Sequence, residues 1–191
     1  MHFASAATMY CNLDTLLDGC WKARPKGPKR MALLIEGFPR PHHPLPEFAK
    51  LLFLLREHGA KATFVVDWHD IRERGLSASV GEMMQLLRGE KHEVAIRFFC
   101  DPCSASHLRH HAVEALHFLQ RVYGITATSV KVGCRMPMAA SALETLGLTP
   151  VDGVGAQRVV RDSNDVLNDV ELVLHDCQQM EVVCVSDLKI T

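Results

Sequence analysis

The stretch His58-Gly-Ala-Lys-Ala-Thr-Phe-Val-Val66 decides the fold of this chain. Its second half is rich in β-branched and aromatic residues, which favour a buried strand, and Gly59 is a typical helix terminator. Just upstream, apolar residues recur at the spacing of one helical face, at Phe48, Leu51, Leu52 and Leu55. The stretch therefore predicts a helix, a short turn and a strand, which is one unit of an alternating α/β domain.

The same alternation continues on both sides of this stretch. Further strands are predicted at residues 32–35, 92–99, 130–132, 171–174 and 182–185. Further helices are predicted at residues 79–87, 108–124 and 141–147, the first and last of them opened by the capping pattern Ser-x-x-Glu. These units imply an α/β fold with a parallel sheet and helices outside it. Periodicity leaves a doubly wound sheet and a closed barrel both open.

Composition is that of a single globular domain. The chain has 191 residues, of which 48% are hydrophobic and 23% charged, and its formal net charge is −1. This charge balance argues against a general surface for binding nucleic acids or anionic membranes. No apolar run approaches the roughly 20 residues that span a bilayer. We expect residues 1–30 to be an extension and residues 31–191 the folded domain. The basic run 22–30 is interpreted as a solvated linker, with contact to an acidic partner or RNA as the alternative.

The chain is expected to work inside the cell. Its first residues lack the basic segment and the unbroken apolar core of a secretory signal. Its seven cysteines form no disulfide framework, which favours a reducing compartment. The cytoplasm and an organelle interior, such as the mitochondrion, both stay open.

Five fragments, in order along the chain, resemble the NodB-like polysaccharide deacetylases of carbohydrate esterase family 4. They are Ala-Leu-Leu-Ile-Glu-Gly-Phe-Pro at 32–39, the run 58–66, His-Glu-Val-Ala-Ile-Arg-Phe-Phe-Cys-Asp-Pro at 92–102, Cys-Arg-Met-Pro-Met-Ala at 134–139 and Leu-Val-Leu-His-Asp at 172–176. The resemblance implies a distorted, truncated (β/α)7 barrel with its site at the carboxyl ends of the strands.

The resemblance also implies a chemistry, the hydrolysis of an N-acetyl or similar amide by a metal-bound water. In the family an aspartate and two histidines hold a divalent ion, usually zinc, which lowers the pKa of its water toward about 7. At these three positions this chain has Gly37, Arg97 and Asp101. Gly37 offers no ligand and Arg97 adds a fixed cation, so Asp101 alone is not a zinc site. We therefore expect no cofactor.

Three further positions keep residues related to those of the family. Glu36 stands at the position of the family's base, Arg135 matches the arginine that orients the base, and His175 matches the acid. Opposite charges thus gather where the metal belongs. We expect an ion-pair cluster in its place, made of Glu36, Arg97, Asp101 and Arg135.

Cys100 and Cys103 form a lone C-x-x-C pattern with histidines nearby at His107, His110 and His111. A zinc site would need a second ligand pair at workable geometry, and a redox pair would need a helix to begin at the cysteines. Both alternatives stay open, and ordinary loop cysteines are favoured.

The sequence favours a catalytically inactive protein that acts as a scaffold or accessory subunit, with other protein subunits as partners. A carbohydrate- or small-ligand-binding module is one alternative, although two Trp and two Tyr offer few stacking platforms for sugars. An atypical metal-independent amide hydrolase, with Glu36 as base and His175 as acid, is the other. Such groups alone supply roughly 10² to 10⁴ in rate, which is little for amide hydrolysis.

Overall fold

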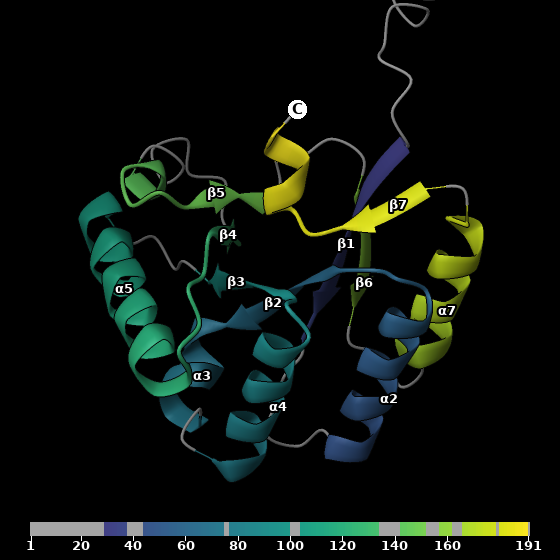
Figure 1. Ribbon diagram of the computed structural model, residues 1–191. Coiled ribbons are helices and arrows are strands. Elements are labelled where there is room, and N and C mark those ends of the chain that lie inside the picture. Colours follow the sequence, from purple (N-terminus) through teal and green to yellow (C-terminus); the bar gives the residue numbers. More distant parts are fainter. Residues whose placement is uncertain are drawn as a thin grey trace, which may run out of the picture.

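The described part of the chain is a curled parallel sheet covered by helices (Figure 1). The computed structural model describes residues 29–37, 44–74, 77–99, 104–133, 142–151, 157–161, 166–178 and 180–190. In chain order its elements are β1 (Lys29–Glu36), α2 (Leu45–Glu57), β2 (Ala62–Asp67), α3 (Trp68–Arg74), α4 (Ala78–Gly89), β3 (Glu93–Phe98), α5 (Ala105–Phe118), η1 (Leu119–Tyr123), β4 (Ser129–Val132), β5 (Thr149–Pro150), β6 (Gln157–Arg161), α7 (Val166–Asp176), β7 (Met180–Val183) and η3 (Ser186–Ile190). None of the helices in these ranges is long and apolar enough to cross a membrane.

Strand β1 organises the sheet. The strands run in the order β5-β4-β3-β2-β1-β6, and neighbouring strands pair in parallel. Lys29–Ala32 of β1 pairs with β7 and Leu33–Glu36 pairs with β2, while Ala32–Glu36 pairs with β6. Because Ala32 is matched with residues of both β7 and β6, these two strands lie on opposite edges of β1. No strand of the described residues joins β5 to β6. The sheet is therefore a half-barrel, which confirms the truncated barrel implied by the resemblance.

The strands are buried on both sides, as their continuous apolar runs suggest. On the outer side Leu33, Phe64 and Ile96 are fully buried in the core beneath the helices. The inner side is filled by a separate and smaller cluster, made of Ala32, Leu34, Val65, Ala95, Val151 and Val185. This inner cluster leaves both ends of the half-barrel to polar side chains.

A buried carboxylate fastens the amino end of the half-barrel. Glu93, the first residue of β3, is 9% exposed. Its carboxylate accepts hydrogen bonds from Thr63 Oγ1 at 2.7 Å, Thr128 Oγ1 at 2.8 Å, Ser129 Oγ at 2.5 Å and the backbone N–H of Ser186 at 3.1 Å. These donors replace the water that the carboxylate loses on burial, and Ser186 ties η3 to the end of the sheet.

His92 is held in the fold as a neutral ring. It is 9% exposed, its Nδ1 accepts a hydrogen bond from the backbone N–H of Ala62 at 3.2 Å, and its ring packs edge-on against Phe64. Burial, and secondly the charge of Lys61, lower the pKa of His92 from 6.5 to about 4. Protonation of the ring therefore opposes folding.

Some predicted elements are wrong. Residues 171–174 lie in helix α7 and not in a strand. Val166, Val170 and Leu174 bury one face of that helix while Leu172 is 64% exposed, so the apolar run is helical in period. Helix α4 begins one residue before Ser79, after an N-cap at Ser77, so the expected capping box is not used.

The sequence also missed several features, among them the short strand β5 (Thr149–Pro150). Strand β6 was not predicted, because its run Gln157–Arg161 has polar residues at both ends, and helix α3 was not predicted either. Strand β1 already includes Lys29 and Arg30, so the predicted extension of residues 1–30 reaches two residues into the sheet. Residues 1–28 lie outside the described part of the chain.

His92 predicts a pH dependence of stability. The unfolded chain takes up a proton near pH 6.5 and the folded chain only near pH 4, so this contribution to stability is present above pH 6.5 and lost as the pH falls toward 4. Between pH 7 and pH 4 the difference in unfolding free energy between the native chain and His92→Asn should shrink by about 3 kcal/mol, measured by urea denaturation. A difference that stays constant with pH would contradict the buried neutral ring.

Candidate functional site

Four neighbouring strands each place one charged residue near the carboxyl end of the half-barrel. Glu36 ends β1, Asp67 ends β2, Arg97 lies near the end of β3 and Lys131 lies in β4. Asp67 stands opposite Arg97 in the β2–β3 register, and Arg97 stands opposite Lys131 in the β3–β4 register. Two acids and two bases therefore share one mouth, which we call the mouth cluster.

Arg97 is the centre of the mouth cluster. Its Nε and Nη2 donate to the two carboxylate oxygens of Asp67 at 2.5 and 2.7 Å, and its Nη1 donates to Glu36 Oε2 at 3.1 Å. Lys131 Nζ donates to the other oxygen of Glu36. The hydrogen bonds to Asp67, followed by the charges of Asp67 and Glu36, raise the pKa of Arg97, although burial acts against them. The guanidinium is thus a permanent cation matched by two acids.

The burial of the mouth cluster makes its pairing obligatory. The side chain of Glu36 is 6% exposed, that of Asp67 8% and that of Arg97 14%. A buried charge without a partner costs several kcal/mol, whereas a bidentate arginine–carboxylate pair with its hydrogen bonds made is tolerated. The cluster is therefore a network of buried ion pairs.

The described residues do not offer a metal site at this mouth. No three His, Cys, Asp or Glu side chains of the described ranges come together closely enough to hold an ion. Gly37 follows Glu36 with a φ of 94°, a backbone conformation that favours glycine, and its N–H donates to the carbonyl of Val65. Arg97 and Lys131 would repel a divalent cation placed between the two acids.

Comparison by sequence gives no relative, since no family model and no curated protein matches the chain. Comparison by structure does find similar proteins. BA3943 from Bacillus anthracis, described as a CE4 family pseudoenzyme, matches with a TM-score of 0.65 at 12% identity, over 86% of this chain and 66% of that one. The peptidoglycan deacetylase PdaC from Bacillus subtilis matches with a TM-score of 0.63 at 14% identity, over 87% and 93%. A family 4 carbohydrate esterase from Bacillus anthracis also matches with a TM-score of 0.63, at 16% identity, over 85% and 83%.

The chain has the carbohydrate esterase family 4 fold. Identities of 12 to 16% establish the fold alone. The NodB-like fold expected from the ordered fragments is therefore confirmed, and what the chain does has to be argued from its own residues.

On this family 4 fold, part of the predicted ion-pair cluster comes together. Glu36 and Arg97 are in direct contact. Asp101 and Arg135 lie outside the described residues, so the four-residue cluster as a whole stays a prediction. Asp67 and Lys131, which sequence reasoning missed, hold the two described members in place.

His175 does not join the mouth of the family 4 fold. It is exposed in the last turn of α7, and that helix leads into β7, whose first residue pairs with Lys29 at the start of β1. Helix α7 thus ends at the amino end of the sheet, whereas Glu36 lies at the carboxyl end. The expectation that His175 occupies the acid position is wrong, because it assigned a helical segment to a strand.

The histidines of the C-x-x-C region lie on α5. His107 and His110 are exposed, and His111 Nδ1 lies 3.5 Å from Glu114. Cys100 and Cys103 are outside the described residues, so the zinc and redox alternatives stay open there.

Removing the central cation should strongly destabilise this family 4 fold. Arg97→Met keeps most of the side-chain volume but removes the bidentate hydrogen bonds to Asp67 and one of the two cations on Glu36, so we expect a loss of about 3–5 kcal/mol in unfolding free energy. The matched control is Arg56→Met, which removes an exposed pair with Glu90. It should cost less than about 1 kcal/mol. Equal losses in urea denaturation would contradict a buried, obligatory network.

Proposed function

We propose that this chain is a catalytically inactive protein of the deacetylase fold that serves as a scaffold or accessory subunit of a larger assembly. The observation that carries the proposal is the Arg97 guanidinium, which fills the mouth where a deacetylase of this family needs a metal ion. Its donors are engaged by Asp67 and Glu36, so the mouth is neutralised by ion pairs instead of by a bound cation.

The remaining positions support the loss of catalysis. Gly37, at the place of the metal-binding aspartate, carries no side chain. Glu36, at the place of the base, has both carboxylate oxygens engaged, one by Arg97 and one by Lys131. The strand beside β1 at the mouth is β6, and its last residue, Arg161, stands opposite Glu36 in the register. By register, an arginine therefore stands beside the engaged Glu36.

One similar structure gives the proposal a precedent. BA3943 is described as a CE4 family pseudoenzyme, and one of its mutants as having restored enzymatic activity. A protein of this fold can therefore exist in a form without activity. For the present chain, this makes the fold compatible with a role other than hydrolysis.

The open side of the half-barrel supports a partner. Val159 of β6 stands opposite Leu34, whose side chain belongs to the inner cluster, yet Val159 is 41% exposed. It is exposed because no described strand closes the sheet between β6 and β5. Edge strands with exposed apolar side chains favour association with another chain. We place the partner at this edge.

Zinc content and acetate release test the loss of activity. The purified chain should contain far less than one zinc per molecule by mass spectrometry and release no acetate from N-acetylglucosamine oligomers above background. Stoichiometric zinc, together with acetate release that is abolished by Glu36→Gln, would overturn the proposal. Glu36→Gln needs a folding control by circular dichroism, because its side chain is buried.

The position of the partner is tested by two matched substitutions. Val159→Lys should release the chain from the larger assembly in which it migrates on native size-exclusion chromatography of cell extract. Val122→Lys, on η1, changes a valine of similar exposure, 39%, and should leave the assembly intact. A native chain that elutes at its own mass of 21.3 kDa would contradict a subunit role. Equal effects of the two variants would contradict the β6 edge.

A further inference from the structure

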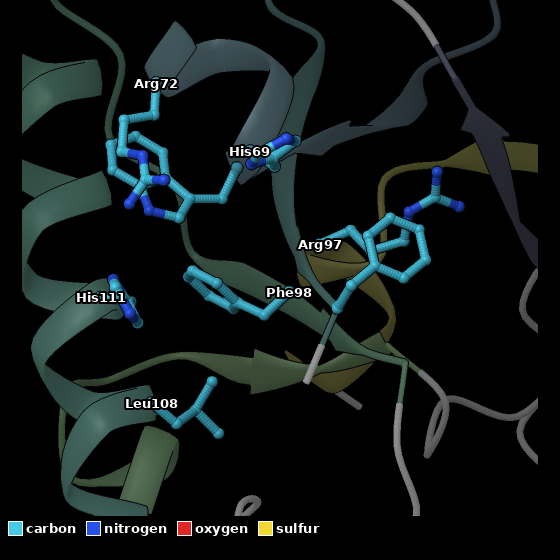
Figure 2. A pocket seen from close by; sticks show the side chains of 8 residues that line it. His69, Arg72, Arg97, Phe98, Leu108 and His111 are labelled. Atoms are coloured by element: carbon cyan, nitrogen blue, oxygen red, sulfur yellow. The ribbon is translucent and has the colours of Figure 1, made fainter. Parts of the chain in front are cut away.

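A pocket beside the mouth cluster, which shares only Arg97 with it, lies between the end of β3 and the helices α3 and α5 (Figure 2). Its volume is about 280 Å³, near the lower end of the range for small-ligand sites. Its apolar walls are formed by Trp68, Phe98, Phe99 and Leu108. Such walls suit a single flat ring, which can pack against the aromatic faces.

The polar lining of this pocket is basic. None of its eight lining side chains is an aspartate or glutamate, whereas His69, Arg72, Arg97 and His111 all contribute to it. Figure 2 shows His69 and Arg72 extending from α3 and His111 extending from α5, with Phe98 coming from β3. A ligand that carries positive charge is therefore disfavoured, and a negatively charged group is favoured.

Arg72 is the cation that remains for a ligand. Arg97 already binds Asp67 and Glu36, and its guanidinium lies 4.7 Å from the centre of the Phe99 ring. His69 lies 3.4 Å from Glu73, and His111 lies 3.5 Å from Glu114. In the described part of the chain, exposed Arg72 has no hydrogen bond or ion pair. Its fork of donors can bind a carboxylate with two hydrogen bonds.

A buried donor in the pocket wall also lacks an acceptor. Trp68 is 6% exposed, and its Nε1 has no hydrogen-bond partner in the described structure. Its ring is fixed edge-on against Phe118, with ring centres 5.8 Å apart. Buried donors are nearly always satisfied in folded proteins, so this unpaired N–H is a polar group of the Trp68 ring that the fold leaves without an acceptor.

We infer that this pocket binds a small aromatic carboxylate, with the ring between Phe98 and Trp68 and the carboxylate on Arg72. A purely inorganic anion would leave the apolar walls unused, and a neutral ring would leave Arg72 without a partner. The inference does not depend on the proposed function, because none of the ligand's contacts involves catalysis at the mouth.

Benzoate is the probe, and the fluorescence of Trp68 is the readout. The chain has two tryptophans, so the variant Trp21→Phe leaves Trp68 as the only emitter. Benzoate should change this emission saturably, with a dissociation constant on the order of 0.1–1 mM for a ligand of this size. Benzamide and acetate, which each lack one half of the recognised chemistry, should bind at least roughly tenfold more weakly, a difference of about 1.4 kcal/mol.

Two variants locate the site. Arg72→Gln should weaken benzoate at least roughly tenfold, whereas Arg121→Gln, an exposed arginine on η1, should leave the affinity unchanged. Because Arg72 is exposed, both variants should keep the native melting temperature. Leu108→Phe, which narrows the pocket without adding a tryptophan, should abolish the fluorescence response. The inference is overturned if benzoate gives no saturable signal, if Arg72→Gln binds it as well as the native chain, or if acetate binds equally well.

Discussion

The contacts of Arg97 and Lys131 with Glu36 join strands that are not neighbours in the sheet. Parallel strands lie about 4.8 Å apart, so in a flat sheet β4 and β1 would be roughly 14 Å from each other. Lys131 nevertheless reaches Glu36, and Arg97 reaches it across β2. These contacts require the sheet to curl around its inner face. The curl of the half-barrel and the ion pairs of the mouth cluster therefore depend on each other.

The inner face is divided into an apolar middle and two charged ends. Small and branched side chains such as Ala32 and Ala95 fill the middle. Glu93 closes the amino end with hydroxyl and backbone donors, whereas Glu36 at the carboxyl end is held by cations. Neutral hydrogen-bond donors leave the negative charge of a carboxylate unbalanced, whereas an arginine and a lysine balance it with positive charge. At the carboxyl end, Arg97 and Lys131 thus balance the charge of Glu36.

The sequence predicted the fold better than the site. The run His58–Val66 and the strands on either side of it were correct, because buried parallel strands are short apolar runs between turn signals. The contact of Arg97 with Glu36 also followed from opposite charges at two matched positions. Asp67 and Lys131 were missed because only family positions were considered. The sequence did carry a signal for both residues. Asp67 ends one apolar strand run and Lys131 lies within another, and each is a single charged residue in its run, as Arg97 is.

The error at His175 has a physical origin. Leu172-Val-Leu174 is compatible with a strand or with a helix, because three apolar residues do not define a period. The helix is decided by Val166 and Val170, which lie earlier in the chain and share one buried face with Leu174. A motif match of five residues could not detect that wider pattern.

The pairing of β1 with β7 has a consequence for biosynthesis. Arg30, near the start of the sheet, donates to Glu181, which lies 151 residues later in the chain. On the ribosome, which adds residues from the amino end, the first half of β1 must wait until these 151 residues have been added before β7 can pair with it. Until then this apolar strand is exposed to other nascent chains and to chaperones. Such distant pairing slows folding, so the synthesis of β7 determines when β1 is protected from aggregation.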